Sequence, residues 1–378
     1  MRYVKFFAYT AYCIPNLRKE VKTMNAFRFV GKLGFGALDS KMPYLRTGKT
    51  GKGSDYKSLN FSVAPNKNNR AYVECFGMVQ DKIKTMDTGN PAQKKEVAWA
   101  DRLDEKVISE VARFRRFSVK LNGKYNEFIT EWDFINFVTE HLDELKDKEF
   151  VVTGTLSLNV YKGNTSYRFK AQSIREIGTD EEIENGLTVR FDTFYRAKDI
   201  VLDNWKKDKE VIINAFTYQY VDNTVQFKYV PVSYYINLAN ETNEKKAAFF
   251  LKQFGIDADE VKTKIKDKEV VSLPVRCDYI NGSEEVAFDE SCLTDNQREM
   301  IEFGLKTLND FKPNGSIFGQ RITKYVCVDA DLRGDYANGY KVEEISAGEF
   351  ESMIYTPEAT EKNVNDSKDN ADIEALFG

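Results

Sequence analysis

The chain has 378 residues, which is long enough for two or three domains, and its 13% aromatic content excludes a largely disordered protein. Its one histidine, His141, and five scattered cysteines without a CxxC pair argue against histidine-based catalysis and most zinc sites. We therefore expect no cofactor, no metal and no enzymatic activity, and the cysteine usage is typical of a reduced, cytoplasmic compartment.

The net charge of −4 conceals an uneven distribution along the chain. Residues 1–23 carry five basic and one acidic residue, residues 24–178 carry 26 and 19, and residues 179–378 carry 24 and 39, which gives +4, +7 and −15. A basic front half predicts a polyanionic partner. Solvated surface charge is the alternative reading of the same numbers.

The N-terminal stretch "MRYVKFFAYTAYC" resembles a signal peptide only faintly, because its apolar run is short and interrupted by polar residues. No run in the chain reaches the length of a membrane span, so we expect no membrane association. A strand pattern begins at Met24, and we interpret residues 1–23 as an N-terminal extension.

Residues 24–178 predict short strands and one helix. Residues 26–35, 58–64 and 70–79 alternate like strands, residues 131–145 have helical apolar spacing, and residues 149–174 predict a strand, a turn and a returning strand. This order fits an OB-type five-stranded barrel. The region 81–130 is an insertion, polar and partly helical at first, with a further alternating run at 111–121.

A basic segment, residues 41–70, follows the first of these strands, contains the second in its latter half and includes the sequence GKT at 48–50. A nucleotide-binding P-loop would need a glycine at position 43, where this chain has Pro43, which offers no N–H. We therefore predict that residues 45–57 form a flexible basic loop without a nucleotide pocket.

The pattern of residues 179–355 predicts a second β-rich domain, and another OB-like barrel is one form that it could take. Residues 211–238 read as a hairpin, Thr294 and Gln297 have capping-box spacing ahead of a helix to residue 308, and strands follow near 316–328 and 340–345. The sequence Lys-Asp-Lys-Glu occurs before a β-branched run at both 146–149 and 266–269. Either an internal repeat or chance explains that similarity.

Residues 356–378 have the composition of a disordered acidic tail, with six acidic and two basic residues in this range. The tail ends in apolar groups on an acidic leader, and it is either a solubilising end or a linear motif that docks in a partner protein. The predicted docking residues are Asp372, Ile373, Glu374, Leu376 and Phe377.

The stretch "LKDKEFVVTGTLSLNVYKGNTSYRF" (145–169) resembles a segment of bacterial single-stranded DNA-binding proteins, an OB-fold family. Gly154 matches the family's mid-strand glycine, and Tyr161 and Phe76 fall where the family places base-stacking aromatics. "SLNFSVAP" and "RAYVECFG" resemble its second and third strands. The resemblance covers roughly residues 24–80 and 140–177.

The chain departs from the family in three respects. Its tail ends Leu-Phe-Gly where the family has a proline-phenylalanine pair, which puts the docking role of the tail in doubt. The insertion and the second domain lie outside a typical member, and this length is more similar to a phage-encoded version. The resemblance implies a protein that coats single-stranded DNA in replication, recombination or repair and recruits partner proteins through its tail, with a homo-oligomer left open.

Sequence-tolerant binding of a single strand needs cations for phosphates and flat rings for bases. On a strand over 111–121, Arg113 and Arg115 would share one face while Phe114 anchors in the core. The residues predicted to contact nucleic acid are Arg46, Lys49, Lys52, Lys57, Phe61, Tyr72, Phe76, Arg113, Arg115, Arg116, Tyr161, Tyr167 and Arg168.

Two other functions fit the sequence. One is an interaction or strand-annealing factor that acts through the acidic second domain. The other is a metal-dependent nuclease, for which Asp329, Asp331, Glu343 and Glu344 supply candidate carboxylates.

Overall fold

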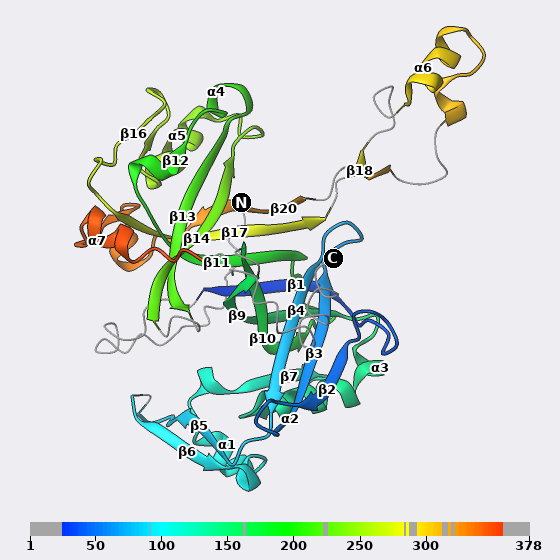
Figure 1. Cartoon of the computed structure of the whole chain (residues 1–378), viewed down its shortest axis with the longest axis vertical. Helices are drawn as coiled ribbons and strands as arrows, with labels where there is room; N and C mark the ends of the chain where they lie inside the picture. Colours follow the sequence, from blue (N-terminus) through cyan, green and yellow to red (C-terminus); the bar gives the residue numbers. More distant parts are fainter. Residues whose placement is uncertain are drawn as a thin grey trace, which may run out of the picture.

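The computed structural model describes residues 25–90, 92–161, 164–221, 226–282, 285–286, 293–311, 317–318 and 322–357. The predicted N-terminal extension and the acidic tail from residue 358 lie outside this range. The described part is mainly β with some α, as the sequence predicts. Figure 1 shows the elements in two groups, one above the other along the long axis.

Five strands of the first half form a closed cycle of pairings, which we call the first ring. β1 pairs antiparallel with β3 and β9, β3 pairs antiparallel with β4, β4 pairs parallel with β10, and β10 returns antiparallel to β9. These strands confirm the predicted ones and comprise Ala26–Gly34 (β1), Asp55–Ala64 (β3), Ala71–Met78 (β4), Glu149–Tyr161 (β9) and Asn164–Glu176 (β10).

Helix α2 (Glu131–Glu140) packs on β3 and β4 and is followed by the short α3 (Leu142–Leu145). The Thr130 side chain accepts a hydrogen bond from the Asp133 amide at its N-terminus, which satisfies a donor that the helix leaves unpaired. Its approach to β4 requires glycine at Gly77, because a Cβ there would lie 2.3 Å from the Trp132 nitrogen. Gly154 likewise lets β9 approach β10, since its Cβ would lie 1.9 Å from the Lys170 carbonyl oxygen.

The basic segment between β1 and β3 is more ordered than predicted. Residues Leu45–Lys49 form β2, which pairs antiparallel with β3, so the expected flexible loop is a hairpin with a short turn. The prediction of a loop was wrong because Gly51 and Gly53 are confined to the turn, while Gly48 is accommodated within β2 opposite Tyr56.

The predicted insertion contains its own small elements. These are β5 (Lys82–Met86), β6 (Lys94–Ala98), η1 (Trp99–Asp101), α1 (Glu105–Ser109), η2 (Arg113–Arg115), β7 (Phe117–Leu121) and β8 (Lys124–Phe128). The strand predicted over 111–121 is wrong in its first half, where η2 is a 3-10 helix. The Arg116 guanidinium donates to the carbonyl oxygens of Val111 and Ser109, and these two bonds hold the chain in a turn before β7 begins.

Five strands of the second half form a second ring with the same order of pairings. β11 pairs with β13 and β17, β13 with β14, β14 with β20 in parallel, and β20 with β17. The strands are Gly186–Tyr195 (β11), Glu210–Val221 (β13), Gln226–Asn237 (β14), Val271–Gly282 (β17) and Ile322–Ala330 (β20). In each ring a helix, α2 or α5 (Glu244–Gln253), lies between the third and fourth strands, and the Lys-Asp-Lys-Glu sequences come just before the fourth strand.

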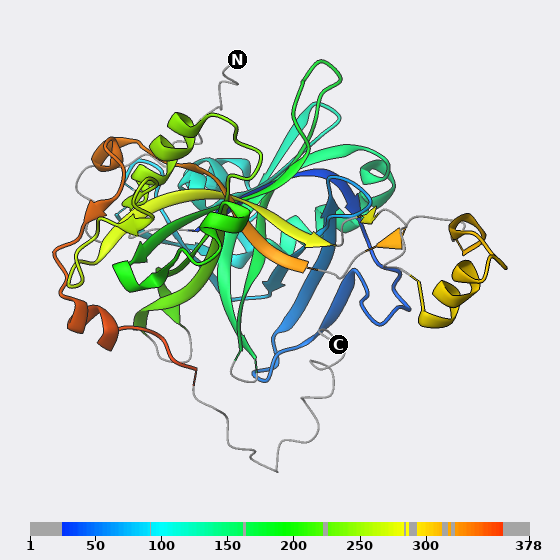
Figure 2. The ribbon, with the colours of Figure 1, turned by 90° about the horizontal axis from the view of Figure 1, so that it is seen from above.

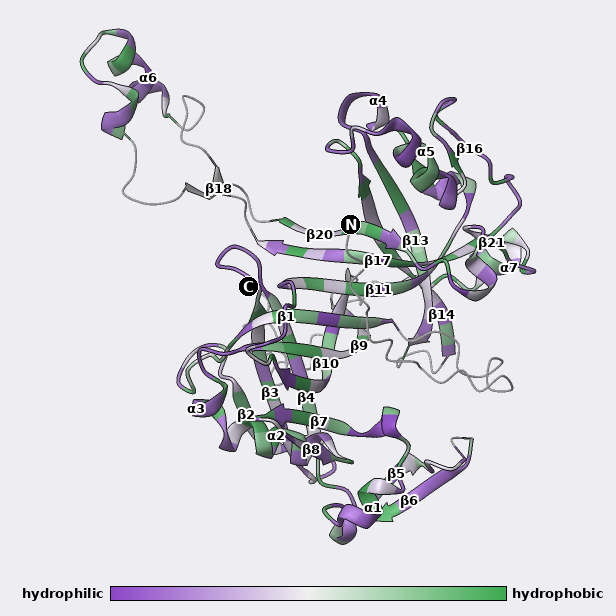
Figure 3. Cartoon of the chain, turned by 180° about the vertical axis from the view of Figure 1, so that it is seen from behind, coloured by the Kyte–Doolittle hydropathy of each residue, from purple (hydrophilic) through white to green (hydrophobic). Residues whose placement is uncertain are grey.

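The two rings share one sheet and one hydrophobic core. Their first strands, β1 and β11, pair antiparallel in the middle of the molecule (Figure 1). A single buried cluster includes Phe29 and Phe169 from the first ring and Tyr279 from the second, with the rings of Phe169 and Tyr279 5.1 Å apart. The first and second rings of strands are therefore packed as one body. Figure 3 shows that hydrophobic and hydrophilic residues alternate along many of the strands.

The remaining elements are short. They are η3 (Ala197–Asp199), β12 (Ile200–Val201), α4 (Trp205–Asp208), β15 (Ile256–Asp257), β16 (Lys262–Thr263), β18 (Glu285–Val286), α6 (Asp295–Glu302), η5 (Leu308–Phe311), β19 (Ile317–Phe318), η6 (Gly334–Tyr336), β21 (Lys341–Val342) and α7 (Ala347–Ser352). The predicted capping box at Thr294 and Gln297 is present, and α6 lies well apart from both rings (Figure 2). Within the described ranges no helix is long and apolar enough to cross a membrane.

Candidate nucleic-acid interface

The outer surface of β4 carries aromatic side chains that the strand alternation turns away from the core. Tyr72 and Phe76 are 49% and 44% exposed, whereas Val73 and Cys75 between them are buried. Large rings this exposed on a regular strand are available to stack on flat groups from solution.

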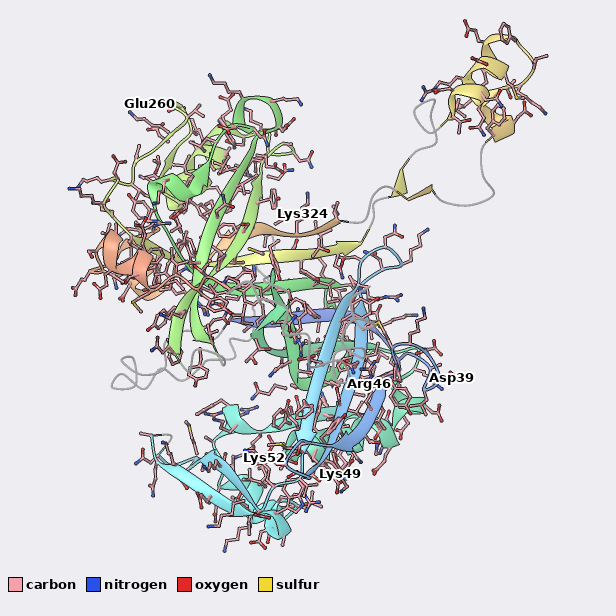
Figure 4. The ribbon with its side chains drawn as sticks, in the orientation of Figure 1. Asp39, Arg46, Lys49, Lys52, Glu260 and Lys324 are labelled. Atoms are coloured by element: carbon pink, nitrogen blue, oxygen red, sulfur yellow. The ribbon has the colours of Figure 1, made fainter. Side chains whose placement is uncertain are left out.

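The neighbouring strands add a third aromatic side chain and a cation to this surface. The Tyr56 ring stacks on the Phe76 ring, with 5.4 Å between centroids and 25° between planes. The register places Ser58 opposite Phe76 and Arg46 opposite Ser58, so Arg46 on β2 lies on the same outer surface. Figure 4 labels Arg46 beside this sheet.

Strand β10 extends the surface on the other side of β4. Lys170 is exposed and opposite Glu74, and the Arg168 guanidinium lies 3.7 Å from the Glu74 carboxylate. Further along β10, Gln172 Nε2 donates to the Phe114 carbonyl oxygen at 2.6 Å, which brings η2 next to the strand.

The η2 turn completes the surface with an exposed ring and a second guanidinium. Phe114 is 52% exposed, and the Arg115 guanidinium carbon lies 5.9 Å from its ring centroid. The prediction that Phe114 anchors in the core is wrong, because the chain turns here and does not continue as a strand. We call this surface the open face; it comprises Arg46, Tyr56, Tyr72, Phe76, Phe114, Arg115, Arg168 and Lys170.

A half-buried carboxyl group, that of Glu131, lies beside residues of the open face. Burial raises the pKa of Glu131, at the start of α2, to about 7, and Glu74 adds to the shift while Lys170 and a hydrogen bond from the Phe76 amide oppose it. Near neutral pH this carboxyl is therefore only partly ionised, which limits its repulsion of an anion on the face.

Two predicted contact residues lie elsewhere in the first ring. Phe61 is 2% exposed and belongs to the core, so the prediction that it contacts DNA is wrong. Lys57 lies on the opposite side of β3 from Tyr56; it donates to Asn136 Oδ1, and its Nζ is 4.6 Å from the Trp132 ring centroid. Lys57 therefore contacts helix α2 and not the open face.

Two further predicted residues have structural partners. The Arg116 guanidinium lies 2.9 Å from the Glu127 carboxylate and donates to two carbonyl oxygens, which leaves it committed to the η2 turn. The Tyr167 hydroxyl lies 3.0 Å from Thr217 Oγ1, and its aromatic side chain lies 5.6 Å from that of Phe191. Tyr167 therefore connects the first ring of strands to the second. We assign both side chains structural roles and do not include them in the proposed DNA surface.

The other predicted cations are exposed. Lys49 forms an ion pair of 2.8 Å with Asp55 at the tip of the β2–β3 hairpin, and Lys52 lies in its turn (Figure 4). Arg113 is exposed on η2 beside Arg115. The side chain of Tyr161 and the predicted docking residues Asp372, Ile373, Glu374, Leu376 and Phe377 lie outside the described residues.

Sequence reasoning missed Tyr56, Lys170 and Glu131. The alternation of β3 puts Tyr56 on the same face as Ser58, and Lys170 lies two residues after Arg168, so both could have been found by extending the period-2 pattern. Glu131 could not, because its position depends on how α2 packs against β4.

Three of the four candidate nuclease carboxylates, Asp329, Asp331 and Glu343, form ion pairs. Asp329 lies 3.1 Å from Arg276 and Asp331 lies 2.5 Å from Arg333. In the part of the chain that the structure describes, no group of three or more His, Cys, Asp or Glu side chains is placed to hold a metal ion.

Comparisons with known proteins give distant structural matches. No protein-family model and no curated protein sequence matches the chain. A crystal structure of a deletion mutant of the single-stranded DNA-binding protein from Thermus aquaticus matches with 12% identity over 68% of this chain and 87% of that chain, at a TM-score of 0.29. The wild-type protein from the same organism matches with 10% identity over 68% and 85%, at 0.27. Overlaps of this size do not by themselves establish a shared fold.

Proposed function

We propose that the chain is a non-enzymatic, sequence-tolerant single-stranded DNA-binding protein and that the open face of the first ring holds the DNA. Both rings have the order expected of OB-type barrels: first, second, third, fifth and fourth strand, with a helix between the third and fourth. OB-type barrels bind oligonucleotides on the surface of strands two and three. Here these strands are β3 and β4, which carry the exposed rings.

The observation that carries the proposal is the combination of exposed rings and cations on one sheet surface. Tyr72, Phe76 and Tyr56 present flat faces to bases, and each base stacked contributes roughly 1–3 kcal/mol. Arg46 on one side and Lys170 on the other are placed to follow the phosphates of a strand that crosses the sheet. Aromatic platforms accept every base, which supports binding without sequence preference.

The finer parts of the function are also proposals. We infer that the protein coats single-stranded intermediates of DNA replication, recombination or repair, and that it is phage-encoded and acts in the host cytoplasm. The acidic composition of residues 356–378 supports a tail that recruits partner proteins. The same composition would repel DNA and so keep the tail available.

Fluorescence anisotropy tests the proposal directly. A labelled single-stranded oligonucleotide is titrated with the full chain across a salt series, with unlabelled duplex as competitor. We expect the logarithm of the affinity to fall linearly with the logarithm of the salt concentration, and we expect duplex DNA to compete poorly. No binding at low salt, or equal competition by duplex, would refute the proposal.

A further inference from the structure

The second ring has the counterpart of the open face, and part of its own chain covers it. β13 and β14 hold the positions that β3 and β4 hold in the first ring, and Phe216 and Tyr229 lie on their outer surface. These two side chains belong to a satellite cluster separate from the main core. Helix α7 lies beside this hairpin (Figure 1).

Phe350 of α7 is completely buried on this aromatic surface. Its ring centroid lies 4.3 Å from that of Tyr229 and 5.4 Å from that of Phe216. The segment after α7 is held by backbone hydrogen bonds on both sides of Tyr229, from its amide to the Met353 carbonyl oxygen and from the Tyr355 amide to its carbonyl oxygen. The cover is therefore in register with β14.

One cation lies against the buried Phe350 ring, and a second lies against the neighbouring Glu351. The Arg196 guanidinium carbon lies 5.1 Å from the Phe350 centroid and 5.6 Å from the Phe216 centroid. Glu351 Oε1 lies 2.8 Å from Arg196 and 2.5 Å from Lys198. A hydrogen bond from Lys198, with the charges of both cations, holds the pKa of Glu351 below its usual range, so the carboxylate is ionised at neutral pH.

The charges balance in a way that fits a phosphodiester. Asp199 pairs with Arg196 at 2.8 Å, so the Arg196, Lys198 and Asp199 group carries one net positive charge, which Glu351 neutralises. A phosphodiester carries the same single negative charge as Glu351. The Phe350 side chain lies between aromatic side chains and the Arg196 guanidinium, and the next residue, Glu351, places an anion on two cations. A stacked base with its phosphate would make the same two kinds of contact.

We propose that this surface is a nucleotide site for single-stranded DNA that α7 fills in place, with Phe350 in the position of a base and Glu351 in the position of a phosphate. The proposal rests on the proposed function of the chain. Burial of one phenylalanine and stacking of one base are of similar strength. Arg196 is buried, so its ion pair with Glu351 cannot be lost cheaply, but a phosphate in the position of Glu351 would keep Arg196 paired. A DNA strand that is already bound to the open face can therefore displace α7. The first ring of strands then binds DNA before the second.

The test compares variants in a background that lacks the open face, Tyr72→Ala with Phe76→Ala. Adding Phe350→Ala and Glu351→Gln removes both mimicking groups. The control adds Phe350→Ala with Glu349→Gln, which makes the same change in net charge two residues away. Anisotropy with labelled oligo(dT) and circular dichroism are measured for each variant.

We expect the background to bind oligo(dT) weakly. The unmasked variant, which adds Phe350→Ala and Glu351→Gln, should regain at least tenfold in affinity. The control with Phe350→Ala and Glu349→Gln should regain less than a third of that. Equal affinities of the folded background and the folded unmasked variant would overturn the proposal. If Phe350→Ala unfolds the chain, Glu351→Gln alone replaces it, with about threefold tighter binding than Glu349→Gln expected and no difference as the contrary result.

The two proposals fail in different ways. If the first proposal is wrong, the wild-type chain does not bind oligo(dT) or its affinity does not respond to Tyr72→Ala and Phe76→Ala. If only the second is wrong, the wild type binds through the open face, and removal of Phe350 and Glu351 changes nothing.

Discussion

Replacement of Phe76 by alanine should weaken binding of single-stranded DNA without unfolding the protein. The Phe76 ring is 44% exposed and contacts Tyr56 on one side, which leaves room for one base. Loss of one stacked base costs roughly 1–3 kcal/mol, which corresponds to an affinity lower by about 5- to 150-fold. Loss of the Tyr56 contact should lower the free energy of unfolding by only about 1 kcal/mol.

The assay is anisotropy of labelled oligo(dT) at fixed salt, paired with urea denaturation of each variant. Phe249→Ala is the matched control, because Phe249 is 62% exposed on helix α5 in the second ring. Its affinity should equal that of the wild type. A Phe76→Ala protein that is folded and binds with unchanged affinity, or a loss equal to that of Phe249→Ala, would refute the stacking role.

Three further predictions separate binding residues from structural ones. Arg46→Ala should reduce the magnitude of the slope of log affinity against log salt by about 0.7, as expected for one lost phosphate contact. Arg116→Ala should leave this slope unchanged and lower the free energy of unfolding by about 1–3 kcal/mol. Equal slopes for both variants would contradict this assignment. Burial raises the pKa of Glu131 from 4.5 to about 7, so the folded protein keeps a proton that the unfolded chain has released, and stability should fall as the pH rises between these values. Glu131→Gln should flatten the dependence of Tm on pH across that window, and an unchanged curve would count against the assignment. Tyr167→Phe removes the hydroxyl bond to Thr217 and should cost about 1 kcal/mol of stability at unchanged DNA affinity, so a large loss of affinity would restore its predicted role as a stacking residue.

The order of the elements along the first half of the chain was accessible from the sequence because it depends on local patterns. Period-2 alternation marks β1, β3 and β4, and the turn-forming sequence Lys-Gly-Asn at 162–164 predicts the division between β9 and β10. Helical spacing places α2 between the third and fourth strands. These elements sufficed to predict an OB-type order for the first half.

The assignment of side chains to faces required register and tertiary contacts. Lys57 and Tyr56 are adjacent in sequence but lie on opposite sides of β3, so a one-residue error decides which of them meets DNA. The η2 turn depends on Arg116 reaching back to two carbonyl oxygens, which propensity cannot reveal.

The cover on the second ring was beyond prediction for a different reason. Phe350 contacts Tyr229 and Phe216 across more than a hundred residues, and nothing near α7 in sequence indicates the surface on which it packs. The sequence showed an aromatic residue and an acidic residue before the tail, whereas the structure shows the aromatic and cationic side chains that receive them.

Photocrosslinking tests the central claim most directly, because it reports where the DNA lies as well as whether it binds. Oligo(dT) containing 5-iodouracil is irradiated with the full chain, and the crosslinked peptides are identified by mass spectrometry. Crosslinks at Tyr72, Phe76 and Tyr56 are the predicted result. Crosslinks confined to segments outside β3 and β4, with these strands unmodified, would contradict the claim that the open face holds the single strand.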